Sequence, residues 1–353
     1  ILEVASAGFT VAAGGGQVQI LSLEGLGGEP LMAGAVLAEN GFSAGDVLPA
    51  LDAGAAEAIT QAASAYAPKE QYWIRRLVEL ELLPAPYAAA PSVDRSGFRS
   101  TRIPTPPAFL QTLRALDLDA AEGLTAAVLM YLARIHNRVE FDIGYRSAAT
   151  SPPVTSERIF SPSPPLRFAC QGTESLAGFV ELFRAARDHA EGRLTYALDL
   201  VGRTPRLREA SGPFTPPVVI EWAEADARPP PVAADLVVRI PADGGDLVLF
   251  SASASLSEHD FGRVHEQLST VLLGLASDGH QPVGEIDTLP SSERAQLLEE
   301  WNSPAIEHEV APSLVAAFEA QVPATPDGVA LTALDQHLPY RQLNSRANRV
   351  AHA

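Results

Sequence analysis

Apolar residues recur at two spacings along the 353-residue chain, and the two spacings alternate. A spacing of three or four residues, typical of helices with one buried face, predicts helices at 50–83, 108–117, 119–137, 175–201 and 258–277. Short apolar runs bounded by Gly, Pro or Ser predict strands at 99–103, 139–148, 166–172, 216–224, 234–240 and 245–255. Alternating helices and strands indicate an α/β layered domain.

Local signals refine this pattern. Pro68 divides the 50–83 helix into two, because proline lacks an amide hydrogen and disrupts the preceding turn. The sequence PADG before residue 245 is a hairpin turn signal, so the two strands on either side of it are expected to pair. Glu258 and Asp260 open the last of these helices, where acidic groups complement the helix dipole.

The two ends of the chain carry weaker patterns. Residues 1–26 alternate apolar and polar positions around AGGGQ, which predicts short strands joined by a glycine turn; 27–42 reads as a short helix leading into a loop. The closing helix has Leu343, Ala347 and Val350 on one face and needs a partner to bury them. The chain also begins without Met. We therefore expect a piece of a longer polypeptide.

Charge and composition exclude several classes of protein. The formal net charge of −18 argues against binding to nucleic acid or to anionic membrane surfaces. No apolar run reaches the roughly 20 residues of a membrane span. The single cysteine, Cys170, excludes a disulfide framework and fits the cytoplasm. Lys69 is the only lysine, so lysine-dependent catalysis has one candidate.

No residue is predicted to be catalytic, cofactor-binding or metal-binding. The eight histidines are never adjacent and never at metal-ligand spacing with Cys, Asp or Glu. There is no G-x-S-x-G elbow, P-loop or dinucleotide-binding glycine motif; the glycines at 14–16 indicate a turn. Cys170 is either a nucleophile or a small core residue. Glu258, His259 and Asp260 could be mistaken for a dyad, but acids in a first helical turn are ordinary capping.

Residues 303–353 resemble the start of an adenylation domain of a nonribosomal peptide synthetase. That family shows F-x-x-Q in a helix, a P-D-x-V-A strand, a turn reading L-T-Y-x-x-L-N, and a helix reading A-N-x-x-A. The matching residues are Phe318, Gln321, Pro326, Asp327, Val329, Ala330, Leu338, Tyr340, Leu343, Asn344, Ala347, Asn348 and Ala351. Pro339 replaces the usual threonine. The family's phosphate loop and catalytic lysine come later, so the resemblance implies that this fragment activates no amino acid.

Residues 286–302 resemble the linker between condensation and adenylation domains. Its matching residues are Leu289, Pro290, Glu293, Arg294, Leu297, Leu298, Trp301 and Asn302. A short amphipathic helix with a buried Trp301 is the simpler interpretation, and the two are compatible.

Residues 67–285 resemble the C-terminal lobe of a condensation domain. EQYWIRRL matches its E-x-Y-W-x-x-x-L opening, GLTAAVLMYLARIHNRVEFDIGYRSA matches a helix and strand, and Pro165, Leu166 and Arg167 match its P-L-R. The family's H-Q-D-x-P-F-E is replaced by GRLTYALDL and its R-D-x-S-x-x-P-L-F by RLREASGPFTPP. The resemblance implies a chloramphenicol-acetyltransferase-like α/β fold. The H-H-x-x-x-D-G motif of the family's other lobe is absent from this sequence, which implies that the fragment is not an enzyme.

Residues 1–49 resemble the C-terminal barrel of a methionyl-tRNA formyltransferase-type protein. The matching residues are Leu2, Val4, Gly8, Val11, Ala12, Gly15, Gly16, Val18, Leu21 and Gly34; a generic hairpin is the alternative. Residues 50–66 would then be a helical connector. A missing first lobe leaves apolar surface uncovered, and we expect 1–49 and 50–66 to help cover it.

In this order the segments resemble a formylating initiation module. The leading hypothesis is a non-catalytic spacer between formyltransferase and adenylation domains, which are its expected partners. One alternative is a remodelled condensation-like acyltransferase or cyclase acting on a carrier-bound acyl group, with His189, Glu191, Asp199 or Cys170 as its chemistry. Another is a carrier-docking module, which makes a carrier domain a further candidate partner. No cofactor is expected.

Overall fold

The computed structural model describes most of the chain. The described ranges are 1–6, 8–25, 29–88, 97–153, 158–210, 214–224, 230, 232, 234–302, 313–333 and 336–353. The chain divides into two compact units, Ile1–Ser291 and Ser292–Ala353. No described helix is long and apolar enough to cross a membrane.

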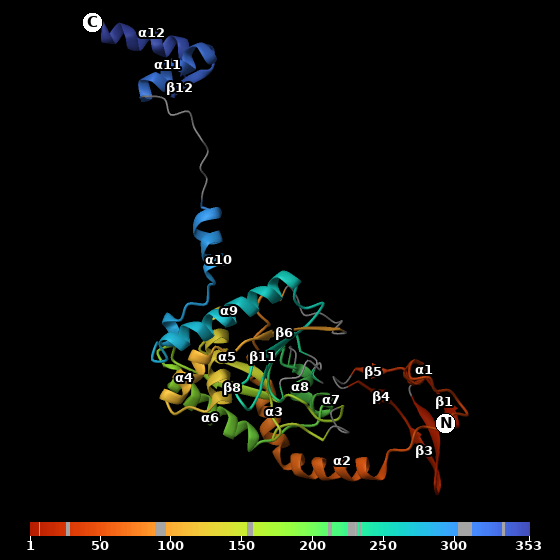
Figure 1. Cartoon of the computed structure of the whole chain (residues 1–353). Helices are drawn as coiled ribbons and strands as arrows, with labels where there is room; N and C mark the ends of the chain where they lie inside the picture. The colour runs from red at the N-terminus through yellow and green to blue at the C-terminus, as the bar shows by residue number, and fades with distance from the viewer. Residues whose placement is uncertain are drawn as a thin grey trace. The chain divides into compact units, whose positions relative to one another are not determined.

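A six-stranded mixed sheet organises the first unit, with strand order β6-β11-β10-β9-β7-β8 (Figure 1). The strands are β6 (Phe98–Ile103), β7 (Glu140–Arg146), β8 (Pro165–Ala169), β9 (Val218–Trp222), β10 (Leu236–Ile240) and β11 (Leu247–Ala252). β10, β9 and β7 are parallel, whereas β6, β11 and β8 each pair antiparallel with their neighbours. The expected strands all form. The PADG turn does join β10 to β11 as a hairpin, with Gly244 at φ 75°.

Four helices build the main core with one face of this sheet (Figure 1). They are α4 (Pro107–Ala115), α5 (Ala120–His136), α6 (Leu176–Glu191) and α9 (Glu258–Ser277). α5 is buried on nearly every side: each residue from Ala121 to Ala133 is buried. α9 begins where the pattern predicted, because the Ser257 side chain accepts a hydrogen bond from the Asp260 amide.

The opposite face of the sheet carries a smaller apolar cluster and most of the buried charge. Val219, Val237, Val248 and Phe250 form the cluster with two residues outside the strands. Because successive strand residues point to opposite faces, their neighbours Val218, Leu236 and Leu249 belong to the main core. The same alternation places Asp142, Glu221 and Arg239 on the second face.

The region before β6 forms a bent helical arm. α2 (Ala53–Tyr66) and α3 (Glu70–Val78) are separated by a 3-10 turn at Ala67–Lys69 that contains Pro68, as expected. Trp73 and Leu77 of α3 join a third cluster with the short helices α7 (Leu200–Arg203) and α8 (Pro205–Glu209). The predicted 175–201 helix is shorter than expected, because α6 stops at Glu191 before Gly192 and Leu194 has a φ of 59°.

Residues 1–49 form small elements with little buried surface. β1 (Glu3–Val4), β2 (Phe9–Ala13) and β3 (Gly16–Ile20) make one antiparallel sheet, and β4 (Leu23–Glu24) pairs with β5 (Pro30–Leu31). The expected glycine turn joins β2 to β3, and α1 (Ala33–Glu39) follows. Only Gly8, Ala33 and Leu37 are buried among the described residues of this stretch.

From Ser291 to the end of the chain, no described residue is buried. A 3-10 turn (Val283–Glu285), α10 (Ser291–Ala295) and a π-helical turn (Gln296–Glu300) come first. α11 (Leu314–Ala324), β12 (Val329–Ala333), β13 (Gln336–Pro339) and α12 (Tyr340–Ala351) follow. The expected helix, strand and closing helix form, but the residues expected as a turn, from Leu338 onward, belong to β13 and to the start of α12. The prediction of a buried Trp301 is wrong, because its exposed fraction is 69%.

The lobe, residues 67–285, shows little open apolar surface, and Tyr66 of α2, in the stretch expected to help cover it, packs edge to face against Phe160. Between residues 67 and 285, the described large hydrophobic residues with substantial exposure are Val78, Val139, Ile159 and Leu273. Val78 lies on α3 and Leu273 on α9, whereas Val139 and Ile159 lie outside the helices and strands.

Candidate functional site

Three parallel strands bring a buried carboxylate between two arginines on the second face of the sheet. Arg146, Glu221 and Arg239 stand at matching register positions on β7, β9 and β10. Glu221 Oε1 lies 3.2 Å from Arg146 Nε, and its Oε2 lies 2.7 Å from Arg239 Nε. The Arg239 guanidinium also lies 4.6 Å from the centroid of the Phe250 ring. Each oxygen of this buried carboxylate is paired with an arginine from a neighbouring strand, which makes the group a cross-link of the sheet.

Asp142 is the second buried carboxylate, and it ties the helical arm to the sheet. Its side chain is fully buried and pairs with Arg76 of α3 and with Arg167 of β8, whose Nη2 lies 3.0 Å from Oδ2. The Glu81 amide donates to the same Oδ2 at 2.7 Å. Burial, followed by the neighbouring Arg167 charge, lowers the pKa of Arg76 to about 10.

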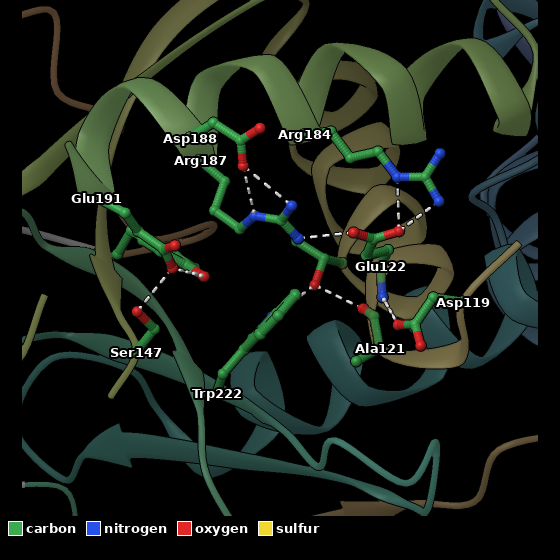
Figure 2. A network of polar contacts seen from close by, with 11 residues as sticks. Asp119, Ala121, Glu122, Ser147, Arg184, Arg187, Asp188, Glu191 and Trp222 are labelled. Atoms are coloured by element: carbon green, nitrogen blue, oxygen red, sulfur yellow. Dashed lines mark hydrogen bonds and ion pairs between the residues drawn. The ribbon is translucent and has the colours of Figure 1, made fainter. Parts of the chain in front are cut away.

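Glu122 clamps α5 to α6 on the helical side (Figure 2). Its Oε2 accepts from Arg184 Nε at 2.7 Å and its Oε1 from Arg187 Nη1 at 2.6 Å. Burial alone would raise the pKa of the Glu122 carboxyl, but the hydrogen bonds from the two arginines outweigh it and lower that pKa. Arg187 also lies over the Trp222 ring, 5.6 Å from its centroid.

Trp222 connects this clamp to the sheet (Figure 2). Its Nε1 donates to Thr125 Oγ1 at 2.9 Å, and Thr125 Oγ1 donates to the Ala121 carbonyl at 2.7 Å. One buried hydroxyl therefore satisfies the indole donor and anchors a turn of α5, which is a structural use of both groups.

Glu191, a sequence candidate for catalysis, is the acceptor of a buried hydroxyl pair (Figure 2). Ser147 Oγ donates to Glu191 Oε1 at 2.9 Å, and the Tyr145 hydroxyl donates at 3.3 Å. Burial, followed by the Glu191 charge, raises the pKa of Tyr145. The phenol therefore stays protonated as a donor, and Glu191 closes α6 onto β7.

His189 lies in a different pocket, on the same helix. Its Nε2 is 3.1 Å from the Tyr72 hydroxyl of α3. A pocket of about 330 Å³ surrounds this pair and is also lined by Arg76, Arg167 and Leu166. Burial raises the pKa of the Tyr72 phenol, and Arg193 lies 4.8 Å from the centroid of its ring.

The remaining sequence candidates lie elsewhere. Cys170 follows β8 within the main core, and burial raises the pKa of its thiol; this is the small core residue and not an activated nucleophile. Asp199 precedes α7 and pairs with Arg203 at 3.2 Å. His189, Glu191, Asp199 and Cys170 each contact different partners, and no hydrogen bond joins any two of them among the described residues. No group of three His, Cys, Asp or Glu in the described part of the chain could hold a metal ion.

Sequence reasoning missed Asp142 and Glu221, the buried carboxylates within strands β7 and β9. An acid inside the apolar runs EFDIGY and VVIEW was the available signal, because a charge in a central strand must be paired. Its partner cannot be read from the sequence, since pairing depends on strand order and register.

Comparison with known proteins gives relatives of one type. No protein-family model matches the chain. A linear gramicidin synthase of Brevibacillus parabrevis is 40% identical over 90 residues, which are 26% of this chain and 2% of that protein. N-(5-amino-5-carboxypentanoyl)-L-cysteinyl-D-valine synthase of Amycolatopsis lactamdurans is 28% identical over 187 residues, 52% of this chain and 5% of that protein. The chain thus matches only a small part of each relative.

Solved structures show the fold. A four-domain nonribosomal peptide synthetase bound to AMP and glycine superposes with a TM-score of 0.56 at 13% identity, over 81% of this chain and 25% of that chain. The first condensation domain of the CDA synthetase gives a TM-score of 0.50 at 18% identity, over 81% of this chain and 70% of that chain. The chain is a condensation-domain-like α/β segment with sequence relatives among nonribosomal peptide synthetases.

Proposed function

We propose that this chain is a non-catalytic positioning segment of a formylating synthetase initiation module. Residues 67–285 would be a single condensation-type lobe that spaces a formyltransferase domain, ending in 1–49, from an adenylation domain that begins in 303–353. Residues 50–66 and 286–302 would be its two connectors. The observation that carries the proposal is that the lobe is closed on itself: its buried Asp142 and Glu221 carboxylates are paired with arginines, and few of its described large hydrophobic residues are exposed.

A spacer is useful only if it is stiff. Linked domains gain effective concentration when their separation matches what a tethered carrier can span, and they lose it when the geometry fails. Three kinds of cross-link supply stiffness here: the Glu221 pair across the strands, the Asp142 hub between arm and sheet, and the Glu122 clamp between helices. The pairs Arg146–Glu221, Arg76–Asp142 and Arg187–Glu122 each join elements more than 60 residues apart in sequence.

The flanking segments support the same proposal by their composition and burial. The described residues of 1–49 and 292–353 bury almost nothing, while Leu298, Trp301, Leu314 and Val350 are each more than half exposed. Apolar surface of this kind is normally covered by further protein. Adenylation and formyltransferase domains are the partners that the sequence resemblance suggests.

The test replaces 67–285 in the parent synthetase with a flexible linker of similar span. Intact mass of the carrier domain then reports aminoacyl and formyl-aminoacyl loading. We expect aminoacylation to persist and formylation to fall. Persistence of both loadings would overturn the positioning role and leave the lobe a passive relic. The matched control keeps the lobe and carries His189→Gln, Glu191→Gln, Asp199→Asn and Cys170→Ala together; we expect it to load both groups as the parent does.

One observation favours an enzymatic alternative, the remodelled acyltransferase or cyclase. The His189 and Tyr72 pair lies in hydrogen-bond contact within a pocket whose walls include two arginines, and a histidine beside a phenol can carry protons. Tyr72→Phe removes the hydroxyl and preserves the ring. A product of the parent synthetase that is lost in Tyr72→Phe and in His189→Gln, with both loadings intact, would favour this alternative over the spacer.

A further inference from the structure

A second pocket lies between the helical arm and the lobe. Its volume is about 410 Å³, within the usual range for small-molecule sites. One wall is α2 with the turn after it and the first residue of α3, another is the segment 158–160, and the third is the segment 197–203, which contains α7. These walls come from three separate parts of the sequence, so the pocket exists only in the folded lobe.

The inner surface of this pocket is apolar and aromatic. The Tyr66 and Phe160 rings meet edge to face with centroids 4.9 Å apart. Ile59, Ala63 and Ala197 line the remainder, and the two alanine methyls leave the volume open. Burial raises the pKa of the Tyr66 phenol, so at neutral pH this ring adds no charge to the wall.

The rim of the pocket carries two arginines that differ in their ion pairing. Arg203 is held by Glu70 and by Asp199, with its Nη1 3.1 Å from Glu70 Oε2. Arg158 lines the same pocket, and it makes no hydrogen bond, ion pair or ring contact within the described part of the chain. Among the described residues, the rim therefore offers one guanidinium, that of Arg158, without a partner beside an apolar floor.

We propose that this pocket binds a small amphipathic carboxylate, with its apolar body on Ile59, Ala63 and Phe160 and its carboxylate on Arg158. A guanidinium fork matches one carboxylate in two parallel hydrogen bonds. A doubly charged phosphate would fit less well, because Glu70 and Asp199 stand on the same rim and repel a second negative charge. The site involves no reaction, and it does not depend on the positioning role.

Four probes test separately whether the pocket binds the apolar body of the ligand and whether it binds the carboxylate. Hexanoate and phenylacetate carry the anionic group on an aliphatic and an aromatic body, and hexanamide and phenylacetamide are their neutral counterparts. Each is titrated into the full chain while amide chemical shifts are followed by NMR. We expect saturable shifts with both carboxylates and affinity about tenfold weaker for the amides, the loss of one charge-assisted contact.

Two variants and a control locate the site. Arg158→Gln should weaken both carboxylates about tenfold and leave the amides unchanged. Ala63→Leu should abolish binding of all four probes by filling the pocket, and the exposed position of Ala63 on α2 lets the helix tolerate leucine. Arg206→Gln removes the same charge from exposed α8, outside the pocket, and should change nothing. Carboxylate binding that survives Arg158→Gln, or no saturable binding at all, would overturn the proposal.

Discussion

Asp142 and Arg76 form an ion pair in which the carboxylate is fully buried and the guanidinium is 10% exposed. The pair joins a sheet strand to α3, 66 residues earlier in the sequence. Arg167 completes the arrangement from β8, so a single carboxylate balances two arginines. The pair therefore holds three elements in register, and each depends on the charge at residue 142.

Asp142→Asn should strongly destabilise the lobe. The amide keeps the shape of the side chain but leaves Arg76 and Arg167 without their buried counter-charge, which costs about 3–5 kcal/mol. Chemical unfolding of the full chain, followed by near-UV circular dichroism, measures this loss. Glu140→Gln is the matched control, because Glu140 pairs with the same Arg167 from a side chain that is 48% exposed; it should cost at most about 1 kcal/mol. Equal losses of unfolding free energy in the two variants would contradict the view that Asp142 is the buried carboxylate that joins α3, β7 and β8.

The Glu122 clamp should make stability fall in acid. Its pKa is lower in the folded chain than in the unfolded chain, so its stabilisation is present above about pH 4.3, the ordinary value, and is lost as the pH falls through the folded pKa. Glu122→Gln should therefore differ from wild type by a constant amount near neutrality, and the difference should shrink below about pH 4. Glu181→Gln, on the exposed side of α6, should show no such convergence in unfolding free energies measured across pH.

Gly144→Ala should destabilise the centre of the sheet. A Cβ at residue 144 would lie 2.7 Å from Val219 Cγ2 and 3.2 Å from Pro216 Cβ, and overpacking of this kind costs about 1–3 kcal/mol. Val219→Ala in the same chain should recover part of that loss by removing the nearest methyl. Gly262→Ala is the contrasting control, because its Cβ meets nothing within 4 Å in helix α9; it should stabilise the chain by about 0.5–1 kcal/mol. The midpoint temperatures of thermal unfolding, measured for the wild type, Gly144→Ala, Gly144→Ala with Val219→Ala, and Gly262→Ala, test these expectations.

Replacing Trp73 with alanine should lower the free energy of unfolding far more than replacing Trp301. Trp73 is fully buried in the third cluster, and Trp73→Ala should cost about 3–5 kcal/mol. Trp301 is 69% exposed, and Trp301→Ala should shift the unfolding free energy of this chain by no more than about 0.5 kcal/mol. A large loss in Trp301→Ala, measured by denaturant unfolding, would mean that the linker residue is buried in solution.

Much of the fold could be predicted from spacing, because local rules govern it. The strands, the break at Pro68 and the start of α9 at Ser257 follow from patterns within a few residues. The end of α6 was missed because Gly192 and Leu194 continue an apolar pattern that backbone conformation interrupts. Periodicity reports which side chains are apolar, and it does not report where the chain adopts a positive φ.

The polar contacts could not be predicted in the same way. Glu221 with Arg239 and Asp142 with Arg76 are visible as charges in the sequence, but the first pair needs the neighbouring strands β9 and β10, and the second needs α3 packed beside β7. His189 and Glu191 were candidates because of their residue type, yet two residues of separation on a helix turned them toward Tyr72 and Ser147 respectively. Residue type identifies possible chemistry, and three-dimensional neighbours decide whether it is used.

The uneven burial along this chain sets where it could be recombined. Residues 67–286 hold the three apolar clusters and the ion pairs that cross-link them, whereas no described residue after Ser291 is buried. A chimera joined between Ile286, which is buried, and α10 would separate a folded body from a stretch that depends on its surroundings. We expect the lobe to exchange as one folded body when the joint is placed there, since the joint cuts no described apolar cluster.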